Sequence, residues 1–393
     1  MTRLLNVYMN KNKVGVLKEK NGKTFSFSYD HNSKSFISLS MKSLDKEYDD
    51  KVVRPFLENL LPEGKIIDYI AKVHLVSKNN PFSLLSKIGE DCAGAISFTN
   101  NDVFVSQPLN YLPKDDFLSL LENNEKGLSY YKKGMRLSLA GAQDKISLLI
   151  KDGNYYLPSF DNPSTHIVKF NSPNFPSLLI NEFFVTKLAN KLKISVSLID
   201  YINEPYPHLI IERYDRSNNL RIHQEDFCQI LSVRPHNKYQ KEGGPSFKNI
   251  VEIINKDLSN PALNIINLSR ILIFNYLIGN CDYHSKNISV LYKDDLNLSP
   301  FYDLLSTYIY DDLSKDMAMS INKIYNIDLI TKEDIIKEFD SWGIHGKNMF
   351  SLIMKEFNNI IPIAKSIVND TKYHQTELLK IVDIIEKNYN KII

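Results

Sequence analysis

Three polar residues in the second half of the chain have the types and spacing that phosphoryl transfer requires. Asn287 follows Asp282 by five positions, and Asp303 follows Asn287 by sixteen. In this chemistry one carboxylate orients the acceptor hydroxyl and takes its proton, while amide and carboxylate oxygens hold Mg²⁺ on the phosphates. An Asp and an Asn five positions apart also occur by chance in solvated turns, so the neighbouring elements decide. With their support, we expect Asp282 to be a catalytic base and Asn287 and Asp303 to be metal ligands.

Hydrophobic patterning predicts the elements that would hold these residues. Residues 268–278 are apolar at helical density, so a buried helix is expected to lead into Asp282. Residues 288–298 predict a short hairpin, with Asn287 at its entrance and Asp303 just past its exit. Two polar ligands held at the ends of one hairpin can converge on a single ion.

A run of small residues lies upstream of a strand expected over 145–150. The run comprises Ser138, Leu139, Ala140, Gly141 and Ala142. Small side chains over 140–142 let backbone N–H groups approach phosphate oxygens closely. A plain hairpin turn would have a similar composition, and that alternative stays open.

Lys169 lies near the end of a β-branched strand expected over 165–170, like the lysine strand that contacts the α- and β-phosphates in kinases. Thirteen residues later, Glu182 opens a helix expected over 183–192. Glu182 could pair with Lys169, or it could be a favourable acid in the first helical turn. The sequence leaves both interpretations open.

The apolar strand expected over 207–212 breaks into polar sequence, as the hinge of a kinase does. The backbone around Glu212 and Tyr214 is expected to meet an adenine ring there. The segments thus follow one another in kinase order: small-residue loop, lysine strand, glutamate helix, hinge, Asp/Asn loop and second Asp. Each signal is weak alone, and it is their common order that favours a kinase.

With these motifs in place, the chain resembles the HipA-type toxin kinases. Seven motifs carry the resemblance: Ser138–Lys145, Thr165–Lys169, Glu212–Arg216, Gln224–Gln229, Gly243–Pro245, Asp282–Asn287 and Pro300–Asp303. Residues 7–17, 56–62 and 81–94 resemble the N-terminal subdomain of the family. The resemblance therefore covers about residues 4–310.

The resemblance implies an α+β, bilobed, protein-kinase-like fold. We expect an N-terminal subdomain over 1–105, a strand-rich N-terminal lobe with the nucleotide loop and hinge over 106–223, and an all-helical C-terminal lobe over 224–393. The resemblance also implies an ATP- and Mg²⁺-dependent serine/threonine-protein kinase that is the toxin of a toxin–antitoxin pair. Its partner would be a helix-turn-helix antitoxin that makes the DNA contact. Its substrate would be an aminoacyl-tRNA synthetase, whose phosphorylation leaves uncharged tRNA and arrests growth.

Carried over residue by residue, the resemblance implies Asp282 as the base and Asn287 and Asp303 as the metal ligands. The implied nucleotide contacts are the loop 138–142, Lys169, Glu212, Tyr214, His284 and Lys286. We expect His284 to brace the loop by hydrogen bonds rather than to bind the metal, since Mg²⁺ prefers oxygen.

Regulation by autophosphorylation is also implied. Family members autophosphorylate a serine at the position of Ser138, which ejects the small-residue loop and silences the enzyme. Relatives with a separate N-terminal subdomain carry two serines in this loop. Here the subdomain is fused and Ser138 is the loop's single serine, so the regulation of the split systems is not expected.

Composition agrees with a soluble globular protein. The 393 residues are 43% hydrophobic and 24% charged, and the formal net charge of +2 does not favour direct binding to nucleic acid. The three cysteines are scattered without metal-ligand spacing, which favours a reducing cytosol, and the family resemblance implies a bacterial cytoplasm. We expect neither a signal peptide nor a membrane span.

Two other classes of function remain open at this stage. A catalytically silent nucleotide-binding co-repressor, the partner of a DNA-binding antitoxin, would keep the fold but lose the base or an ion ligand, and Asp282, Asn287 and Asp303 are all present. A kinase that acts on lipid, or on host proteins after secretion, would share the same motifs. No basic, aromatic-rich surface for a membrane is evident in the sequence.

Overall fold

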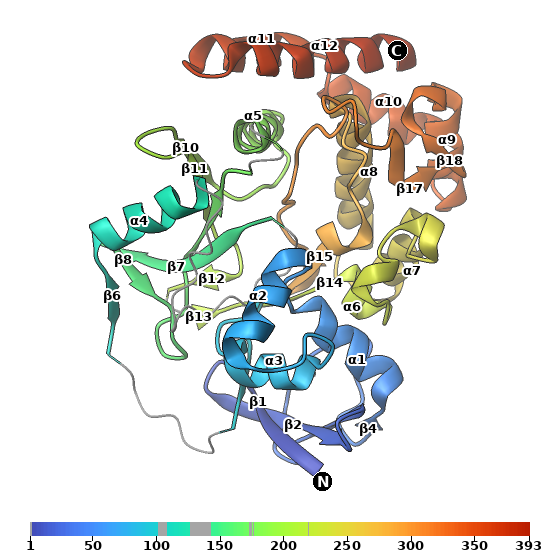
Figure 1. The fold of residues 1–393 in the computed structure, drawn as a ribbon. Helices are drawn as coiled ribbons and strands as arrows, with labels where there is room; N and C mark the ends of the chain where they lie inside the picture. Colours follow the sequence, from blue (N-terminus) through green and yellow to red (C-terminus); the bar gives the residue numbers. More distant parts are fainter. Residues whose placement is uncertain (1, 101–107, 126–142, 173–174, 176, 219) are drawn as a thin grey trace. The chain divides into compact units, whose positions relative to one another are not determined.

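The chain forms two compact units, each described separately below. A computed structural model describes residues 2–100, 108–125, 143–172, 175, 177–218 and 220–393 (Figure 1). The N-terminal unit comprises Met1–Asn174, Ile202–Pro235 and Leu291–Lys293. The C-terminal unit comprises Phe175–Tyr201, His236–Val290 and Asp294–Ile393.

The N-terminal unit combines two antiparallel sheets with short helices. Its elements are β1 (Thr2–Met9), β2 (Asn12–Lys20), β3 (Thr24–Tyr29), β4 (Glu47–Tyr48), α1 (Asp50–Asn59), α2 (Gly64–His74), α3 (Pro81–Ile88), β5 (Ile96–Thr99), β6 (Asn110–Leu112), α4 (Lys114–Glu125), β7 (Lys145–Lys151), β8 (Asn154–Leu157), β9 (His166–Phe170), β11 (His208–Glu212), β12 (Arg216–Ser217), β13 (Leu220–Arg221), β14 (His223–Asp226) and α6 (Phe227–Ile230).

The first sheet has the strand order β4-β3-β2-β1-β5 and carries α1, which packs on β3. Phe25, Phe27 and Tyr29 alternate with serines along β3, so their rings enter the core while the serines stay half-buried. Asp49 caps α1 by accepting the Lys51 N–H. The residues around Pro62 separate α1 from α2.

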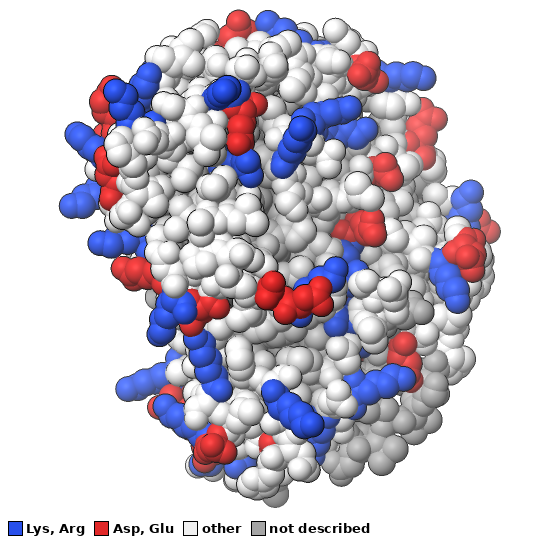
Figure 2. Space-filling model, turned by 180° about the vertical axis from the view of Figure 1, so that it is seen from behind, with Lys and Arg blue, Asp and Glu red and all other residues white. Residues whose placement is uncertain are grey.

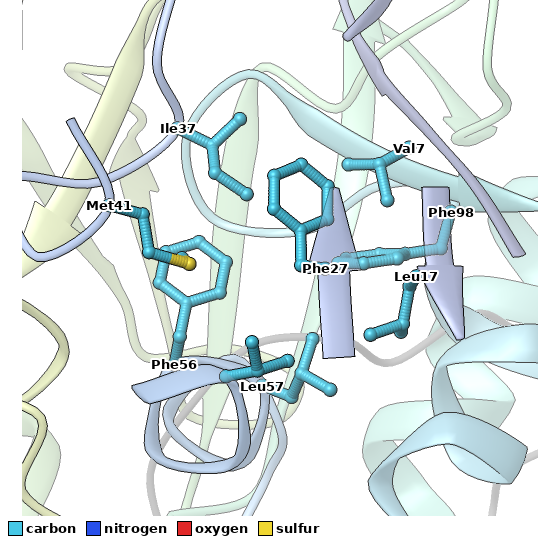
Figure 3. A pocket seen from close by; sticks show the side chains of 9 residues that line it. Val7, Leu17, Phe27, Ile37, Met41, Phe56, Leu57 and Phe98 are labelled. Carbon is cyan, nitrogen blue, oxygen red and sulfur yellow. The ribbon is translucent and has the colours of Figure 1, made fainter. Parts of the chain in front are cut away.

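A small cavity remains between this sheet and α1. Figure 3 shows side chains from the strands, among them Phe27, facing Phe56 and Leu57 of α1. The cavity volume is about 10 Å³, close to the least that admits one water, and the side chains lining it are all apolar. It is therefore a packing void rather than a substrate site.

The second sheet places β11, β9, β7, β8 and β6 side by side. On one face, Ile146 and Leu148 of β7 and Val168 and Phe170 of β9 join the same hydrophobic core as Phe117 of α4. Because successive side chains on a strand point to opposite faces, the residues between them form a second face of different chemistry.

The strand β14 anchors the loop between β3 and β4. His223 Nε2 donates to the Ile37 carbonyl at 2.8 Å. Glu225 accepts hydrogen bonds from Ser38 Oγ at 2.6 Å, from the Leu39 N–H at 2.7 Å and from the Tyr292 hydroxyl. Burial raises the pKa of the Glu225 carboxyl to about 7, and the nearby Asp226 adds to this rise against the three hydrogen bonds.

The C-terminal unit is mainly helical. Its helices are α5 (Leu178–Lys191), α7 (Phe247–Asp257), α8 (Pro261–Ile278), α9 (Lys332–Ser341), α10 (Gly346–Glu356), α11 (Ile360–Asp370) and α12 (Gln375–Ile392), and its strands are β16 (Leu296–Leu298), β17 (Asp316–Ile321) and β18 (Ile324–Asn326). The strands β10 (Ile199–Ile202) and β15 (Ser289–Tyr292) begin in this unit and end in the other. Short 3₁₀ turns cover Pro235–Asn237, Gln240–Glu242, Ser285–Asn287 and Ile327–Leu329.

The helix α8 is the central helix of this unit and packs against α7, α10 and α12. It is apolar and buried over most of its surface, as expected of a helix surrounded by others. Pro261 starts it and Gly279 ends it, which is the favoured placement of both residues. By length and mean hydropathy (1.3) α8 could cross a membrane, but 67% of that window is buried, as in a core helix.

Hydrophobic patterning of the sequence missed three strands after residue 222. Only the 288–298 hairpin was expected there, yet β14 and the β17–β18 hairpin also form. Met317, Ala318 and Met319 of β17 are buried but include no β-branched or aromatic residue, so Ile321 alone gives β17 a local strand signal. β14 is polar because its side chains bind a loop.

Glu225 makes stability depend on pH. The unfolded chain ionises this carboxyl near its ordinary pKa of 4.5, while the folded chain keeps it protonated up to about 7. Stability should therefore fall as pH rises through that window, by an amount on the order of 3 kcal/mol. We expect Glu225→Gln to remove this fall. In urea unfolding, the free energy of unfolding of the variant relative to the wild type should therefore be higher at pH 8 than at pH 5.

The control for lost negative charge is Glu47→Gln, at a surface carboxylate whose pKa is lowered by the Ser26 hydroxyl and by Lys18. This variant should not gain on the wild type as pH rises. Parallel pH profiles for wild type and Glu225→Gln would contradict the assignment.

Candidate active site

The loop that carries Asp282 begins at a glycine that no other residue can replace without strain. Gly279 has φ 71°, in the left-handed region. A Cβ built on it would lie 2.6 Å from the Tyr308 Cβ. The Gly279 carbonyl accepts the Tyr308 N–H at 3.0 Å, so the two segments are in direct backbone contact.

The backbone between Gly279 and Asp282 is held from two directions. Asn280 Nδ2 donates to the Asn275 side chain of α8 at 2.8 Å, and Asn280 Oδ1 accepts the Asp282 N–H at 3.1 Å. The Cys281 N–H donates to Thr307 Oγ1 at 2.8 Å. The Asp282 side chain is exposed at the end of this fixed backbone.

A tyrosine that sequence reasoning missed contacts the predicted base. The Tyr239 hydroxyl donates to Asp282 Oδ1 at 2.6 Å, and the Tyr239 ring meets the His284 ring edge-on at 5.4 Å between centroids. The Gly244 N–H binds the Tyr239 carbonyl at 3.0 Å, in a turn where Gly243 has φ 91°. The glycine pair at 243–244 was the available signal, because such a pair marks a tight turn whose neighbours are fixed in place.

Asn287 ends a 3₁₀ turn over Ser285–Asn287 and is buried. Its Nδ2 donates to the Asp282 carbonyl at 3.4 Å. This contact uses the nitrogen of the amide and leaves Oδ1 as the atom that could bind a cation. His284 and Lys286, the predicted nucleotide contacts in this loop, are also buried.

Asp303 has an unusual backbone conformation. Its φ of 53° lies in the left-handed region, which for a residue other than glycine is unfavourable by about 1–3 kcal/mol, although Asp tolerates it better than most. The preceding Tyr302 hydroxyl donates to the Lys286 carbonyl at 2.9 Å and lies 2.6 Å from Ser289 Oγ. Asp303 is therefore tied, through its neighbour, to the loop and strand that flank Asn287.

The donor set at Asn287 and Asp303 fits Mg²⁺, since amide and carboxylate oxygens are the hard ligands that this ion prefers. Within the described part of the chain, no group of three or more His, Cys, Asp or Glu residues could hold a metal alone. A divalent ion here would complete its shell with phosphate and water oxygens, as Mg²⁺ does in phosphoryl-transfer sites.

Cys281, next to Asp282, is a packing residue. It is buried, and burial raises the pKa of its thiol to about 11. At neutral pH the sulfur therefore stays protonated and is a poor nucleophile.

In the N-terminal unit, two lysines face each other across neighbouring strands. Lys145 of β7 pairs directly with Lys169 of β9, so both side chains leave the same face of the sheet, opposite the face that packs on α4. Both are buried, with exposures of 8% and 4%. Ser147, one step along the same face, is buried too, and its Oγ has no hydrogen-bond partner among the described residues.

The pair places two basic side chains on one face of the sheet, and basic side chains are the groups that bind phosphate oxygens. Lys169 was predicted to bind nucleotide phosphates, whereas Lys145 was not assigned a role. The signal for Lys145 was its strand register, which a single sequence does not specify.

Three residues of the predicted hinge motif, Arg213, Asp215 and Arg216, form buried ion pairs. Arg213 donates to Asp215 at 2.6 Å, while Arg216 and Arg221 lie 3.1 and 3.4 Å from the Asp91 carboxylate. All five side chains are buried. Despite the opposing effect of burial, the arginines hold the pKa values of Asp91 and Asp215 below their usual range.

Glu212 and Tyr214, the two residues that the hinge prediction named, are not part of this ion-pair cluster. Glu212 is exposed at the end of β11, opposite His166 of β9. The Tyr214 hydroxyl donates to the Gln224 side chain. Contact of their backbone with adenine stays a prediction.

The predicted residues thus fall into two groups. Asp282, His284, Lys286, Asn287 and Asp303 lie together in the C-terminal unit, and Lys169, Glu212 and Tyr214 lie in the N-terminal unit. Glu182 belongs to the C-terminal unit, so its pairing with Lys169 stays a prediction. The alternative of a first-turn acid is wrong, because α5 begins at Leu178. Residues 138–142 of the small-residue loop lie outside the described residues.

Two family models match this chain. One, for the HipA-like C-terminal domain, matches residues 137–385, and the other, for the HipA N-terminal domain, matches residues 5–99. The chain belongs to the HipA family. The match to the N-terminal domain within the same chain agrees with a fused subdomain.

Curated relatives support the membership. The chain is 30% identical to "Serine/threonine-protein kinase toxin HipA" of Shewanella oneidensis, over 77% of this chain and 74% of that protein. It is 36% identical to "Putative kinase Y4mE" of Sinorhizobium fredii, over 82% and 81% of the two chains. The expectation of a kinase of the HipA toxin type is confirmed.

A solved structure confirms the fold. The chain matches HipA from the complex of Shewanella oneidensis HipA, HipB and operator DNA with a TM-score of 0.87 and 26% identity. The match covers 99% of this chain and 97% of that one. The expected α+β, kinase-like fold of HipA proteins is therefore present.

We predict that Lys145 contributes to anion binding in this HipA-family chain. Lys145→Met should weaken the binding of ATP by about tenfold or more, because a charge-assisted contact is worth at least ~1.4 kcal/mol. Calorimetric titration with ATP measures this. Lys151→Met, at the exposed end of the same strand, is the matched control and should bind as the wild type does. Equal ATP affinities for Lys145→Met and wild type would show that Lys145 does not contribute to ATP binding.

Proposed function

We propose that this chain transfers phosphate from ATP to serine or threonine hydroxyls of a protein, with Asp282 as the catalytic base. The contact that supports this most directly is the hydrogen bond from the Tyr239 hydroxyl to Asp282 Oδ1 at 2.6 Å. It means that the carboxylate is accessible to a hydroxyl and oriented to accept its proton. An acceptor hydroxyl would bind the same carboxylate in the transfer step.

The reaction follows from these positions. As the acceptor oxygen attacks the γ-phosphorus, its proton passes to the Asp282 carboxylate. The bond between the γ-phosphorus and the bridging oxygen breaks, and ADP leaves. The loop backbone, held at Asn280 and Cys281, keeps the carboxylate at the acceptor.

The other predicted residues bind the nucleotide. Asn287 Oδ1 and the Asp303 carboxylate would hold Mg²⁺, which neutralises charge on the phosphates when it is bound. Lys169 and Lys145 would bind phosphate oxygens from their shared face of the sheet. His284, Lys286 and the backbone at Glu212 and Tyr214 would complete the nucleotide site, and backbone N–H groups of the loop 138–142 would bind the phosphates.

We further propose that the chain is the toxin of a toxin–antitoxin pair in the bacterial cytoplasm. Its antitoxin would be a helix-turn-helix protein, since the structural match comes from a complex with HipB and operator DNA. Figure 2 shows basic and acidic side chains intermixed on one face, which supports DNA contact mainly through the antitoxin. The protein substrate would be an aminoacyl-tRNA synthetase, as the family resemblance implies.

Replacing the base should separate binding from transfer. We predict that Asp282→Ala lowers the rate of phosphate transfer by about 10²–10⁴-fold while ATP binding stays within a few-fold of wild type. Expression of Asp282→Ala should no longer arrest growth. Phosphopeptide mass spectrometry of cells after brief induction measures the transfer and names the substrates.

The matched control is Asp294→Ala, an exposed aspartate in the turn of the neighbouring hairpin, which should arrest growth as the wild type does. Asp282→Asn keeps the side-chain size and tests the carboxylate alone. If Asp282→Ala stayed as toxic as wild type, the harm would come from binding, and a silent co-repressor would become the better interpretation.

Ser138 should switch the enzyme off. A phosphate there adds roughly −1.5 to −2 charge near the γ-phosphate of ATP, and repulsion should drive the loop outward. After incubation with ATP and Mg²⁺, we expect mass spectrometry to find phosphate on Ser138 together with falling ATP affinity. Ser138→Ala should keep its activity over the same time. If the wild type keeps its full activity and Ser138 stays unmodified, Ser138 is not an autophosphorylation switch.

A further inference from the structure

Asn181 of α5 binds both backbone groups of one residue in the segment that follows Asp303. Asn181 Oδ1 accepts the Ser306 N–H at 2.8 Å, and Asn181 Nδ2 donates to the Ser306 carbonyl at 2.8 Å. Asn181 is 1% exposed and Ser306 is fully buried. The side-chain amide thus pairs with the backbone as a neighbouring strand would, in a stretch that belongs to no helix or strand.

This contact fixes one side of Asp303. Ser306 lies three residues after Asp303, and the intervening Leu304 is fully buried. On the other side, Tyr302 is bound to the Lys286 carbonyl. Asp303 keeps its left-handed φ of 53° between these two anchors. Because that conformation is unfavourable by itself, it persists where the surroundings impose it.

The same segment also supports the loop of the base. Thr307, next to Ser306, accepts the Cys281 N–H at 2.8 Å and donates to the Gly279 carbonyl at 3.2 Å. A shift of residues 304–307 would therefore move both the Asp303 carboxylate and the backbone before Asp282. The helix α5 reaches this segment through the Asn181 amide.

We propose that Asn181 is a positioning residue for the divalent cation. By holding Ser306, it keeps Asp303 in the conformation that binds the ion, and so it couples α5 to the metal site. The inference rests on the proposed function, because it takes Asp303 as a metal ligand. Residues that orient metal ligands without touching the ion typically change metal affinity by about 10–100-fold when they are replaced.

The test compares two buried asparagines whose side-chain amides each accept one backbone N–H and donate to one backbone carbonyl. Asn181→Asp keeps the acceptor for the Ser306 N–H but places a carboxylate oxygen against the Ser306 carbonyl. The matched control is Asn264→Asp in α8, because Asn264 Oδ1 accepts the Leu298 N–H at 2.8 Å and its Nδ2 donates to the Asn260 carbonyl at 2.8 Å. Asp303→Ala is the reference for a lost ligand. Asn181→Ser is used if the carboxylate at 181 prevents folding.

The readout is the affinity of the full chain for Mn²⁺ in the presence of a non-hydrolysable ATP analogue, measured by electron paramagnetic resonance, with thermal unfolding alongside. We expect Asn181→Asp to weaken Mn²⁺ binding at least about tenfold. Asn264→Asp should lower the unfolding temperature but bind Mn²⁺ as the wild type does. The concentration of Mg²⁺ that gives half-maximal activity should rise in parallel for Asn181→Asp.

The two ideas fail in different ways. If Asp303→Ala binds Mn²⁺ as tightly as wild type, the metal assignment of the proposed function is wrong, and the role of Asn181 falls with it. If Asp303→Ala loses the ion while folded Asn181→Asp or Asn181→Ser keeps wild-type affinity, Asn181 is merely structural. The same conclusion follows if Asn264→Asp weakens Mn²⁺ binding as much as Asn181→Asp does.

Discussion

The close approach of Gly279 and Tyr308 is the constraint on which the candidate site depends. It lets the chain leave a buried helix and turn at once into the loop of Asp282, while the segment after Asp303 lies against that turn. Thr307 then binds backbone groups on both sides of Asn280. The predicted base and the predicted metal ligand Asp303 are therefore set by one shared stretch of backbone. A side chain at position 279 would collide with Tyr308 and so push apart the two segments that carry Asp282 and Asp303.

In the N-terminal unit, charged residues of the predicted hinge motif form buried ion pairs. Its buried cluster holds three arginines against Asp91 and Asp215. Removing one partner from such a cluster leaves an uncompensated buried charge, which typically destabilises by about 3–5 kcal/mol. Burial also lowers the pKa of Arg216 to about 10, an effect that the neighbouring Arg213 reinforces. The cluster joins Asp91 to the segment that follows β11.

Sequence patterning found the elements whose signals are local. It found α8 from its apolar density and the 288–298 hairpin from its turn, and with them the loop that carries Asp282, Asn287 and Asp303. It missed what depends on register and on contacts between distant segments. Lys145 faces Lys169 because of strand pairing, and Tyr239 reaches Asp282 across 43 positions of chain. β17 had little strand signal because burial, rather than propensity, stabilises it. The motif Glu212–Arg216 was a marker of the family, and its residues Arg213, Asp215 and Arg216 form part of the buried cluster.

The burial of α8 has a consequence for the time course of synthesis. Asn388 of α12 donates to the Tyr276 and Leu277 carbonyls at 3.0 and 3.3 Å, and Ile384 lies against Gly279, so α12 covers the end of α8 where the Asp282 loop begins. The ribosome adds α12 about 100 residues after α8, which at 5–20 residues per second takes about 5–20 s. Until then the end of α8 and the loop that follows it lack the support of α12. The nascent chain would thus pass through a period in which it is exposed to chaperones and proteases but not yet able to phosphorylate anything.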